Sequence, residues 1–238
     1  MRNTLAIAGK EFRTYFTSPM AYIIAAVYLA ISGFFFIQDI SQLQLARLQG
    51  LLGPSGFLLL LIAPILTMRL FAEEQKIGTL ELLLTAPVRD EEVVLGKFLS
   101  ALGMLVVMVV LTAYYPVLLL IFGNPDPGPM ASGYIGLLLV GMSFLAVGLL
   151  ASSFTSNQIL AAILGIGMLL LFWLISSAAN LIQNLPAAKD ILNYVSLGSH
   201  FSGFLRGVVD TQDVIYYLTF TATALFFTVR SLETRRWR

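Results

Sequence analysis

The sequence predicts an all-α polytopic membrane protein with six transmembrane helices, and its composition, hydropathy and charge each support that fold class. Of its 238 residues, 58% are hydrophobic and only 11% are charged, whereas soluble domains are roughly 45–50% apolar and about 25% charged. A soluble globule of this size could not bury so much apolar surface. The low charge content excludes a disordered chain, and a net charge of +1 provides no basic surface for a nucleic acid.

Six apolar stretches without charged residues are the predicted transmembrane helices, because a helix needs about 20 residues to cross the hydrocarbon core. The second contains Gly53 and Pro54, so its helical part is expected to begin later and to continue past Arg69. The last is short, and Tyr216 and Tyr217 are expected at its interface with the headgroups. In chain order the stretches are Met20–Ile37, Leu51–Met68, Phe98–Phe122, Ser132–Phe154, Ile159–Ile182 and Val214–Val229.

The distribution of lysine and arginine predicts that both termini are cytoplasmic. Only three of the 14 basic residues then fall on the outside, namely Arg47, Lys189 and Arg206. The inside segments carry the others, Arg2, Lys10, Arg13, Arg69, Lys76, Arg89, Lys97, Arg230, Arg235, Arg236 and Arg238. This asymmetry is the one that orients multi-pass proteins. We expect no cleavable signal peptide, because the first apolar run is long enough to span the membrane and is followed by Gln38-Asp39.

Residues 1–18 are expected to form an amphipathic interface helix ahead of the first span. The apolar residues that recur at helical spacing are Leu5, Ala8, Phe12 and Tyr15. A basic helix with aromatic residues lies naturally in the headgroup region, and simple anchoring is the alternative to a functional role there. Ser18-Pro19 predicts an N-cap and the first position of the next helix.

The cytoplasmic segment 69–97 holds ten of the 27 charged residues, and six of the ten are acidic. Acidic residues contribute little to orientation, so the cluster indicates a protein-binding surface. Between Gly78 and Pro87, the apolar run Thr79–Leu84 is too short to span the membrane and too apolar for a purely solvated loop. A short helix between two helix breakers is suited to docking in a groove of a partner protein. The alternative is a solvated hairpin.

The longest external connection, residues 181–213, is expected to contain two short amphipathic helices. The first follows Pro186 and carries Ile191, Leu192 and Val195 on one face. The second places its apolar residues at i, i+3, i+4 and i+7, namely Phe201, Phe204, Leu205 and Val208. Helices satisfy their own backbone groups at the outer leaflet, and both a re-entrant and an interfacial position stay open.

Catalytic and cofactor chemistry finds little support in the sequence. Gly96-Lys97 is followed by Phe98 in place of the Ser or Thr of a nucleotide-binding loop. The absence of cysteine excludes thiolate chemistry, and a single histidine does not make a metal site. No ionisable residue falls within the six stretches, which argues against an ion-driven carrier. Gly165 and Gly167 predict close contacts between helices.

One alternative function is an intramembrane serine protease of the rhomboid type. The chain contains the motif Gly53-Pro54-Ser55-Gly56 and one histidine, His200. A serine nucleophile needs a base within hydrogen-bonding distance. His200 is predicted in the external segment and Ser55 at the mouth of the second span, so the two are not expected to meet. We therefore expect no enzyme activity, no cofactor and no metal.

The motifs together resemble the permease subunits of ABC-2 type transporters, and most nearly the gliding-motility-associated (GldF-like) and copper-site-assembly (NosY-like) branch. The likeness covers nearly the whole chain, so it predicts one ABC-2 type transmembrane domain over residues 1–238. The matching residues are Phe71, Glu73, Gly78-Thr79-Leu80-Glu81, Leu83, Pro87 and Gly96-Lys97, then residues 152–158, then Ser199-His200-Phe201, Phe204, Gly207, Asp210, Asp213 and Tyr216-Tyr217.

The resemblance implies a permease that couples ATP hydrolysis by a separate ABC ATPase subunit to export, or to force transmission towards a periplasmic partner. It implies pairing with a second permease subunit, as a homodimer or heterodimer, in the bacterial inner membrane. It also implies two sets of functional residues. The coupling residues are Glu73, Glu74, Gly78, Thr79, Leu80, Glu81, Leu83, Pro87, Phe154 and Asn157. The external-gate residues are His200, Phe201, Phe204 and Gly207.

Overall fold

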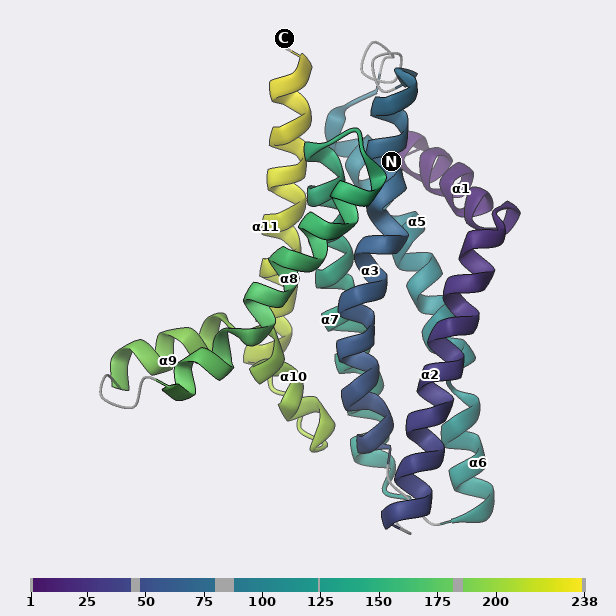
Figure 1. Ribbon diagram of the computed structural model, residues 1–238, viewed down its shortest axis with the longest axis vertical. Coiled ribbons are helices and arrows are strands. Elements are labelled where there is room, and N and C mark those ends of the chain that lie inside the picture. Colours follow the sequence, from purple (N-terminus) through teal and green to yellow (C-terminus); the bar gives the residue numbers. More distant parts are fainter. Residues whose placement is uncertain (1, 44–47, 80–87, 124, 182–185, 237–238) are drawn as a thin grey trace.

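The computed structural model describes residues 2–43, 48–79, 88–123, 125–181 and 186–236, and these residues form helices joined by short connections (Figure 1). Six candidate membrane spans lie among them, which confirms the predicted fold class. The helices are α1 Arg2–Thr17, α2 Pro19–Leu43, α3 Gln49–Ile77, α5 Asp90–Leu111, α6 Tyr114–Phe122, α7 Pro127–Phe154, α8 Gln158–Leu181, α9 Pro186–Val195, α10 Leu197–Leu205 and α11 Thr211–Arg236.

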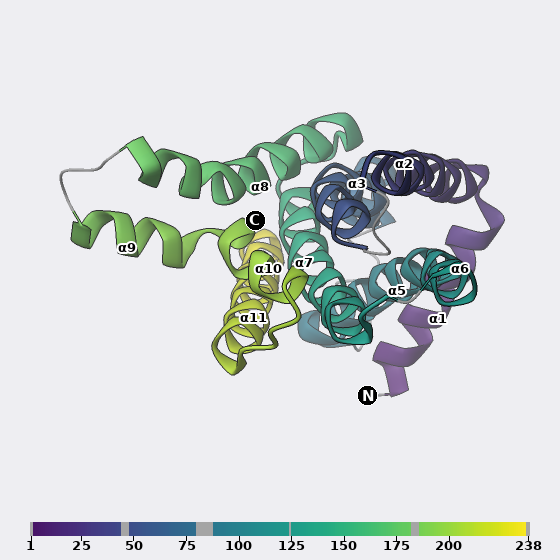
Figure 2. The same ribbon diagram turned by 90° about the horizontal axis from the view of Figure 1, so that it is seen from below.

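The long helices stand side by side, and α3 and α7 lie at the centre of the bundle (Figures 1 and 2). The C-terminus, the end of α3 and the beginning of α5 share one end of the molecule, which we call the termini end. At the opposite end α6 packs beside α2, and α10 lies beside α7 and α11. The α8 helix begins against α3 and α7, and its later part runs beside α9 and projects with it away from the bundle (Figure 2).

The contact between α3 and α7 is close because α7 presents small residues to α3. A β-carbon on Gly148 would meet the Thr67 hydroxyl and would lie 3.0 Å from the Pro64 α-carbon. On the other side of Pro64, a β-carbon on Gly165 of α8 would lie 2.9 Å from its ring. The predicted close contact at Gly165 is thus confirmed. Gly167, by contrast, has no atom within 4 Å of its would-be β-carbon, so that prediction was wrong.

A serine from α7 also enters the backbone ladder of α3. The Ser152 hydroxyl accepts hydrogen bonds from the backbone N–H groups of Phe71 and Ala72, each at 3.1 Å, and donates to the Met68 carbonyl at 2.8 Å. This hydroxyl therefore contacts both the Ala72 amide and the Met68 carbonyl, two groups that pair with each other in a regular helix. It uses the full donor and acceptor capacity of a serine, so it fixes the register of α3 against α7.

The third predicted span is interrupted at Thr112 and Ala113, where α5 ends and α6 begins. Pro116 has no N–H and cannot donate to the Thr112 carbonyl one turn earlier. That carbonyl instead accepts the Tyr134 hydroxyl of α7 at 2.9 Å and the Tyr115 amide at 3.1 Å. The expectation of one continuous helix over Phe98–Phe122 was therefore wrong, although α5 and α6 together still form one candidate span.

The helices extend beyond the apolar stretches that predicted them. The α3 helix begins at Gln49, earlier than expected, and incorporates Pro54. It does continue past Arg69, as predicted, and ends at Ile77. Charged residues of α5 precede its apolar run, since the helix begins at Asp90. A helix continues through such polar turns because its backbone hydrogen bonds do not depend on hydropathy. The hydropathy of the sequence identifies only the portion of the helix that can lie in the hydrocarbon core.

The helix predicted near the N-terminus is confirmed as α1, and α2 begins at Pro19 as expected. The position of α1 at the membrane interface stays a prediction. However, α1 also packs on α5: a β-carbon on Gly96 would lie 2.8 Å from Ile7, and one on Gly103 would lie 2.9 Å from Phe12. Leu5 is 67% exposed, so it is not part of this contact with α5. The Tyr15 hydroxyl is buried and donates to the Leu66 carbonyl at 2.8 Å. Burial raises the pKa of Tyr15 above its ordinary value, so this donor stays protonated.

Replacing Gly148 with leucine is expected to separate α3 from α7 and to lower thermal stability, because overpacking a tight contact costs about 1–3 kcal/mol. The matched control is Gly167→Leu, where the new side chain meets open space. Melting temperatures of the purified variants in detergent check this. Equal melting temperatures for the two variants would contradict the close α3–α7 contact.

Candidate functional site

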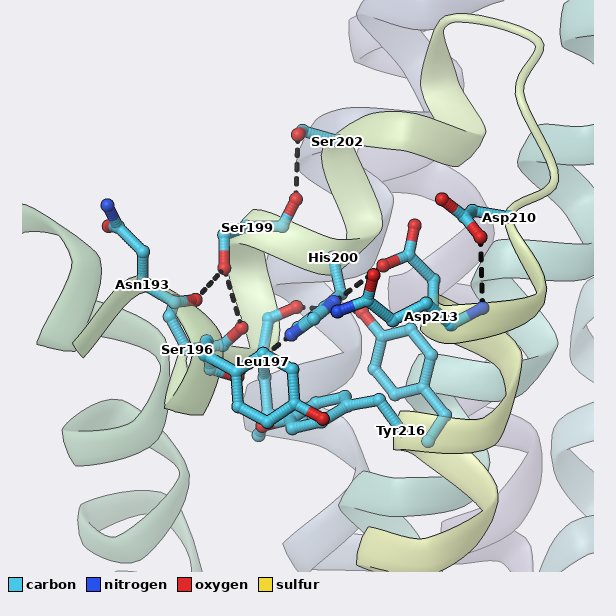
Figure 3. Close-up of polar contacts among 12 residues, drawn as sticks. Asn193, Ser196, Leu197, Ser199, His200, Ser202, Asp210, Asp213 and Tyr216 are labelled. Carbon is cyan, nitrogen blue, oxygen red and sulfur yellow. Dashed lines mark hydrogen bonds and ion pairs between the residues drawn. The ribbon is translucent and has the colours of Figure 1, made fainter. Parts of the chain in front are cut away.

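One of the predicted external-gate residues, His200, lies in a polar and aromatic cluster at the junction of α9, α10 and α11 (Figure 3). His200 on α10 is its centre, with a side chain only 7% exposed. Its Nδ1 lies 2.6 Å from the Asp213 carboxylate on α11, and its Nε2 lies 2.8 Å from the Tyr194 carbonyl on α9. The ring also stacks on Tyr216, with 4.0 Å between ring centres. One imidazole therefore joins three helices.

Both polar partners of His200 are acceptors, and this determines what the cluster can do chemically. A neutral imidazole carries one N–H, so with an ionised Asp213 only one of the two contacts would be a hydrogen bond. For both contacts to be hydrogen bonds, one proton must lie between Nδ1 and the Asp213 carboxylate and another between Nε2 and the Tyr194 carbonyl. With Nε2 directed at a backbone carbonyl, the ring has no free nitrogen to act as a base. The cluster is thus suited to holding helices together.

Two tyrosines of α11 complete the attachment of the gate helices. Tyr216 donates its hydroxyl to the Val195 carbonyl at 2.6 Å, and Tyr217 donates to the Leu197 carbonyl at 2.7 Å. These carbonyls lie at the end of α9 and the start of α10, so the hydroxyls connect the short helices to α11. Both tyrosines were predicted at the membrane interface, but the contacts with α9 and α10 were not foreseen.

Phe201 and Phe204 are directed into the bundle. A β-carbon on Gly56 of α3 would lie 2.6 Å from the Phe201 ring, and one on Gly136 of α7 would lie 2.6 Å from Phe204. Gly207 adopts a positive φ of 93° just after α10, a conformation that favours glycine. Val208 lies beyond this turn and is exposed, so its assignment to the apolar face of the second short helix was wrong. The two predicted short helices themselves are confirmed as α9 and α10.

The serine protease alternative has no support in this geometry. The Ser55 hydroxyl is buried, donates to the Leu51 carbonyl at 2.7 Å and lies beside Ser32. His200 is engaged with Asp213 and Tyr194. Neither residue has the other as its hydrogen-bonding partner in the described part of the chain.

One predicted coupling residue, Glu74, belongs to an ion network at the termini end. Lys97 of α5 is 1% exposed, and its Nζ lies 2.7 Å from Glu74 of α3 and 3.1 Å from Glu11 of α1. The same ammonium lies 5.4 Å from the centre of the Phe71 ring. Because a buried charge is tolerated only when it is paired, the network holds α1, α3 and α5 in one arrangement.

Further hydrogen bonds attach α1 and α7 to the same region. Asn3 on α1 donates to the Glu92 carboxylate on α5 at 3.2 Å, and Glu92 accepts the Arg89 amide at 3.3 Å. Gln75 on α3 donates to the Ser153 carbonyl at the end of α7 at 3.0 Å. The ends of α3, α5 and α7 are thus connected where the chain leaves the bundle.

An open groove of about 460 Å³ lies between α1 and the end of α3, beside this ion network. Lys10 and Thr14 line it from α1, and Glu73 and Ile77 line it from α3. Ile77 is exposed although it is a large apolar residue. The groove therefore offers both charge and apolar surface next to the segment that joins α3 to α5.

The remaining coupling residues have separate positions. Gly78 ends α3 in the left-handed conformation, with φ 79°, and Thr79 beside it is exposed. Asn157 caps α8, because its Oδ1 accepts the Ile159 amide at 2.9 Å. Phe154 ends α7 and is half exposed. The predicted residues Leu80, Glu81, Leu83 and Pro87 lie outside the described residues.

Sequence reasoning missed several residues that the structure brings into these clusters. Glu11 gave no signal, since a single acid near a helix end is ordinary. Ser152 and Lys97 both belonged to the resemblance, and Lys97 also directly precedes 25 uncharged residues, Phe98–Phe122, but their contacts were not foreseen. Asp213 and Tyr216 were among the residues that carry the resemblance. The sequence did not indicate that both contact His200.

Comparison with known proteins gives one match of full length. The family model described as "ABC-2 family transporter protein" matches residues 5–231, a range that contains every helix named above except the ends of α1 and α11. No curated protein matches the chain.

Asp213→Asn is expected to destabilise the junction of α9, α10 and α11, since a buried polar contact that is lost costs about 1–3 kcal/mol. The asparagine keeps the size of the side chain but not the acceptor-only carboxylate. Asp210→Asn is the control, because Asp210 is exposed and bonds only the nearby Gln212 amide among the contacts described. Thermal unfolding in detergent measures both. A melting temperature that falls no further for Asp213→Asn than for Asp210→Asn would count against this role of the pair.

Proposed function

The chain belongs to the ABC-2 family of transporter proteins, and on that premise we propose that it is the permease subunit that converts ATP hydrolysis by a separate ATPase into movement of its transmembrane helices. Binding and hydrolysis of ATP take place on the ATPase. This chain supplies the membrane path and the surface through which the ATPase acts on it.

The observation that carries this proposal is the Glu11–Lys97–Glu74 network. It lies near the end of α3 and the beginning of α5, the two helices that the segment 78–89 connects. A force applied to that segment reaches α3 through Glu74 and α5 through Lys97, while Glu11 adds α1. Because the paired charges are nearly enclosed, their relative positions resist change. The network therefore supports a role of the α3 and α5 ends that flank the segment as a rigid base on which a moving partner acts.

The groove beside the network also supports docking of the ATPase at the termini end. Its charged residues come from two helices, and the exposed Ile77 supplies apolar area of the kind that interfaces bury. Through Gln75 and Ser152, the end of α3 is also joined to the end of α7, next to the turn at residues 155–157. We propose that the ATPase contacts both places, with Phe154 as the exposed apolar residue of the second.

The proposed assembly contains a second permease subunit, either another copy or a related chain. Exposed apolar side chains on α2 and α8, such as Phe34, Ile37 and Leu171, supply surface for that subunit and for lipid. The gate residues would then close the path at the end opposite the ATPase. The output is export of a cargo or force transmitted to a periplasmic partner, and the narrower likeness to the GldF-like and NosY-like branch stays a prediction.

The test is to co-purify the chain with its ATPase and to measure ATP hydrolysis. Leu83→Ala removes apolar area from the proposed docking segment. Burial of a leucine is worth about 1.5–3 kcal/mol, so association is expected to weaken roughly ten- to a hundredfold. Glu81→Arg is expected to impair binding by placing an unpaired charge in the interface. If both variants bound the ATPase normally and kept normal activity, the segment would be a solvated hairpin.

Two further variants in the same assay separate docking from transmission. Lys97→Met leaves two carboxylates without their cation and is expected to retain the ATPase while losing the stimulation of hydrolysis by the permease. Glu11→Gln is the milder variant, since it keeps the Lys97–Glu74 pair and releases only α1. Lys189→Met, a change of the same kind on α9, is the control. Full stimulation in Lys97→Met would argue against transmission through the network.

The proposed orientation places the termini end in the cytoplasm. The chain has no cysteine, so single cysteines report accessibility directly. Ser156→Cys at the α7–α8 turn is expected to react with a membrane-impermeant maleimide only after cells are permeabilised. Thr211→Cys at the start of α11 is expected to react in intact cells, because both positions are exposed but lie at opposite ends. The reverse pattern would overturn the orientation.

A further inference from the structure

A second groove, of about 230 Å³, lies between α5 and α11 and is separate from the proposed docking surface. Its walls are apolar and include Val94 and Leu95 on α5 and Leu225, Phe226 and Val229 on α11. Leu95 and Phe226 are 44% and 53% exposed. The groove is thus an open apolar channel on the surface of the bundle.

Charged residues occupy only one end of this groove. The α5 helix begins at the termini end and α11 ends there, so Glu91, Arg230 and Glu233 gather at that end. From Ala222 to Val229 the apolar lining of α11 spans roughly 10 Å at 1.5 Å per residue. This length fits within one leaflet, which is about half of a 30 Å hydrocarbon core. The groove is therefore suited to the headgroup of a phospholipid and the adjoining part of one acyl chain.

The charges at the polar end determine which headgroup fits. Arg230 donates to the Glu233 carboxylate at 2.6 Å and lies 5.0 Å from the centre of the Phe226 ring. A guanidinium has five donors in a fixed plane, so Arg230 can bind a phosphate as well as Glu233. The two carboxylates exceed the one guanidinium, so the rim also favours a cation.

We propose that this groove binds a phospholipid whose headgroup carries both a phosphate and a primary ammonium, as in phosphatidylethanolamine. Arg230 binds the phosphate, Glu91 and Glu233 accept hydrogen bonds from the ammonium, and an acyl chain lies on Leu95 and Phe226. An anionic phosphatidylglycerol would add negative charge to an acidic rim. The quaternary ammonium of phosphatidylcholine has no N–H to donate.

The test is native mass spectrometry of the purified chain in detergent. Phosphatidylethanolamine, phosphatidylcholine and phosphatidylglycerol with identical acyl chains are added singly at equal concentration. We expect about fivefold greater retention of phosphatidylethanolamine, the size expected when two partly exposed ion pairs act together. Equal retention of the three lipids, or a preference for phosphatidylglycerol, would overturn the proposal.

Two sets of variants locate the binding. Ala222→Trp fills the groove and is expected to abolish the preferential retention, whereas Thr223→Trp adds the same side chain at the neighbouring exposed position and is expected to leave it unchanged. Glu91→Gln combined with Glu233→Gln is expected to keep lipid binding but to lose the preference over phosphatidylcholine. If Ala222→Trp retained as much phosphatidylethanolamine as Thr223→Trp, or the double variant kept its preference, the lipid would lie elsewhere. None of these measurements requires the ATPase, so they stand apart from the proposed function.

Discussion

The contact between α3 and α7 constrains most of the structure, because it sets how the two ends of the molecule are related. Gly148 permits close approach at Pro64 and Thr67, and the Ser152 hydroxyl occupies a place in the backbone ladder of α3. The two helices therefore cannot slide past each other without leaving backbone groups unpaired, which is costly where water is absent. Since α8, α10 and α11 pack on α7 in turn, α7 connects α3 with the helices that carry His200 and Asp213.

Hydroxyl groups and charges hold different parts of this frame. Inside the bundle, Ser143 bonds Thr221 at 3.0 Å, and the Tyr115 hydroxyl donates to the Leu29 carbonyl at 3.1 Å. Such bonds join helices without burying a charge in hydrocarbon. The ion pairs of Lys97 and of His200 lie instead near opposite ends of the bundle. Packing thus fixes the middle, and charges fix the two ends.

Hydropathy and charge predicted the six spans, the interface helix and the two short helices, because each pattern reports on burial in lipid. They did not predict that α3 begins as early as Gln49. Nor did they predict the break before Pro116, which changes no hydropathy. Pairing between Lys97 and Glu11 could not be predicted either, because 86 residues separate them. The resemblance selected His200 and Asp213 as matching residues, but only the fold gives the contact that explains both.

The packing of α1 on α5 has a consequence for biosynthesis. The residues that receive α1, Gly96 and Gly103, are synthesised about ninety residues after it, and after all of α2 and α3. Until then Glu11 has no ammonium partner from Lys97, and the exposed Leu5 and basic residues of α1 can keep it in the headgroup layer. The amphipathic character of α1 thus suits a waiting position during translation, and the arrival of Lys97 completes the assembly of the termini end.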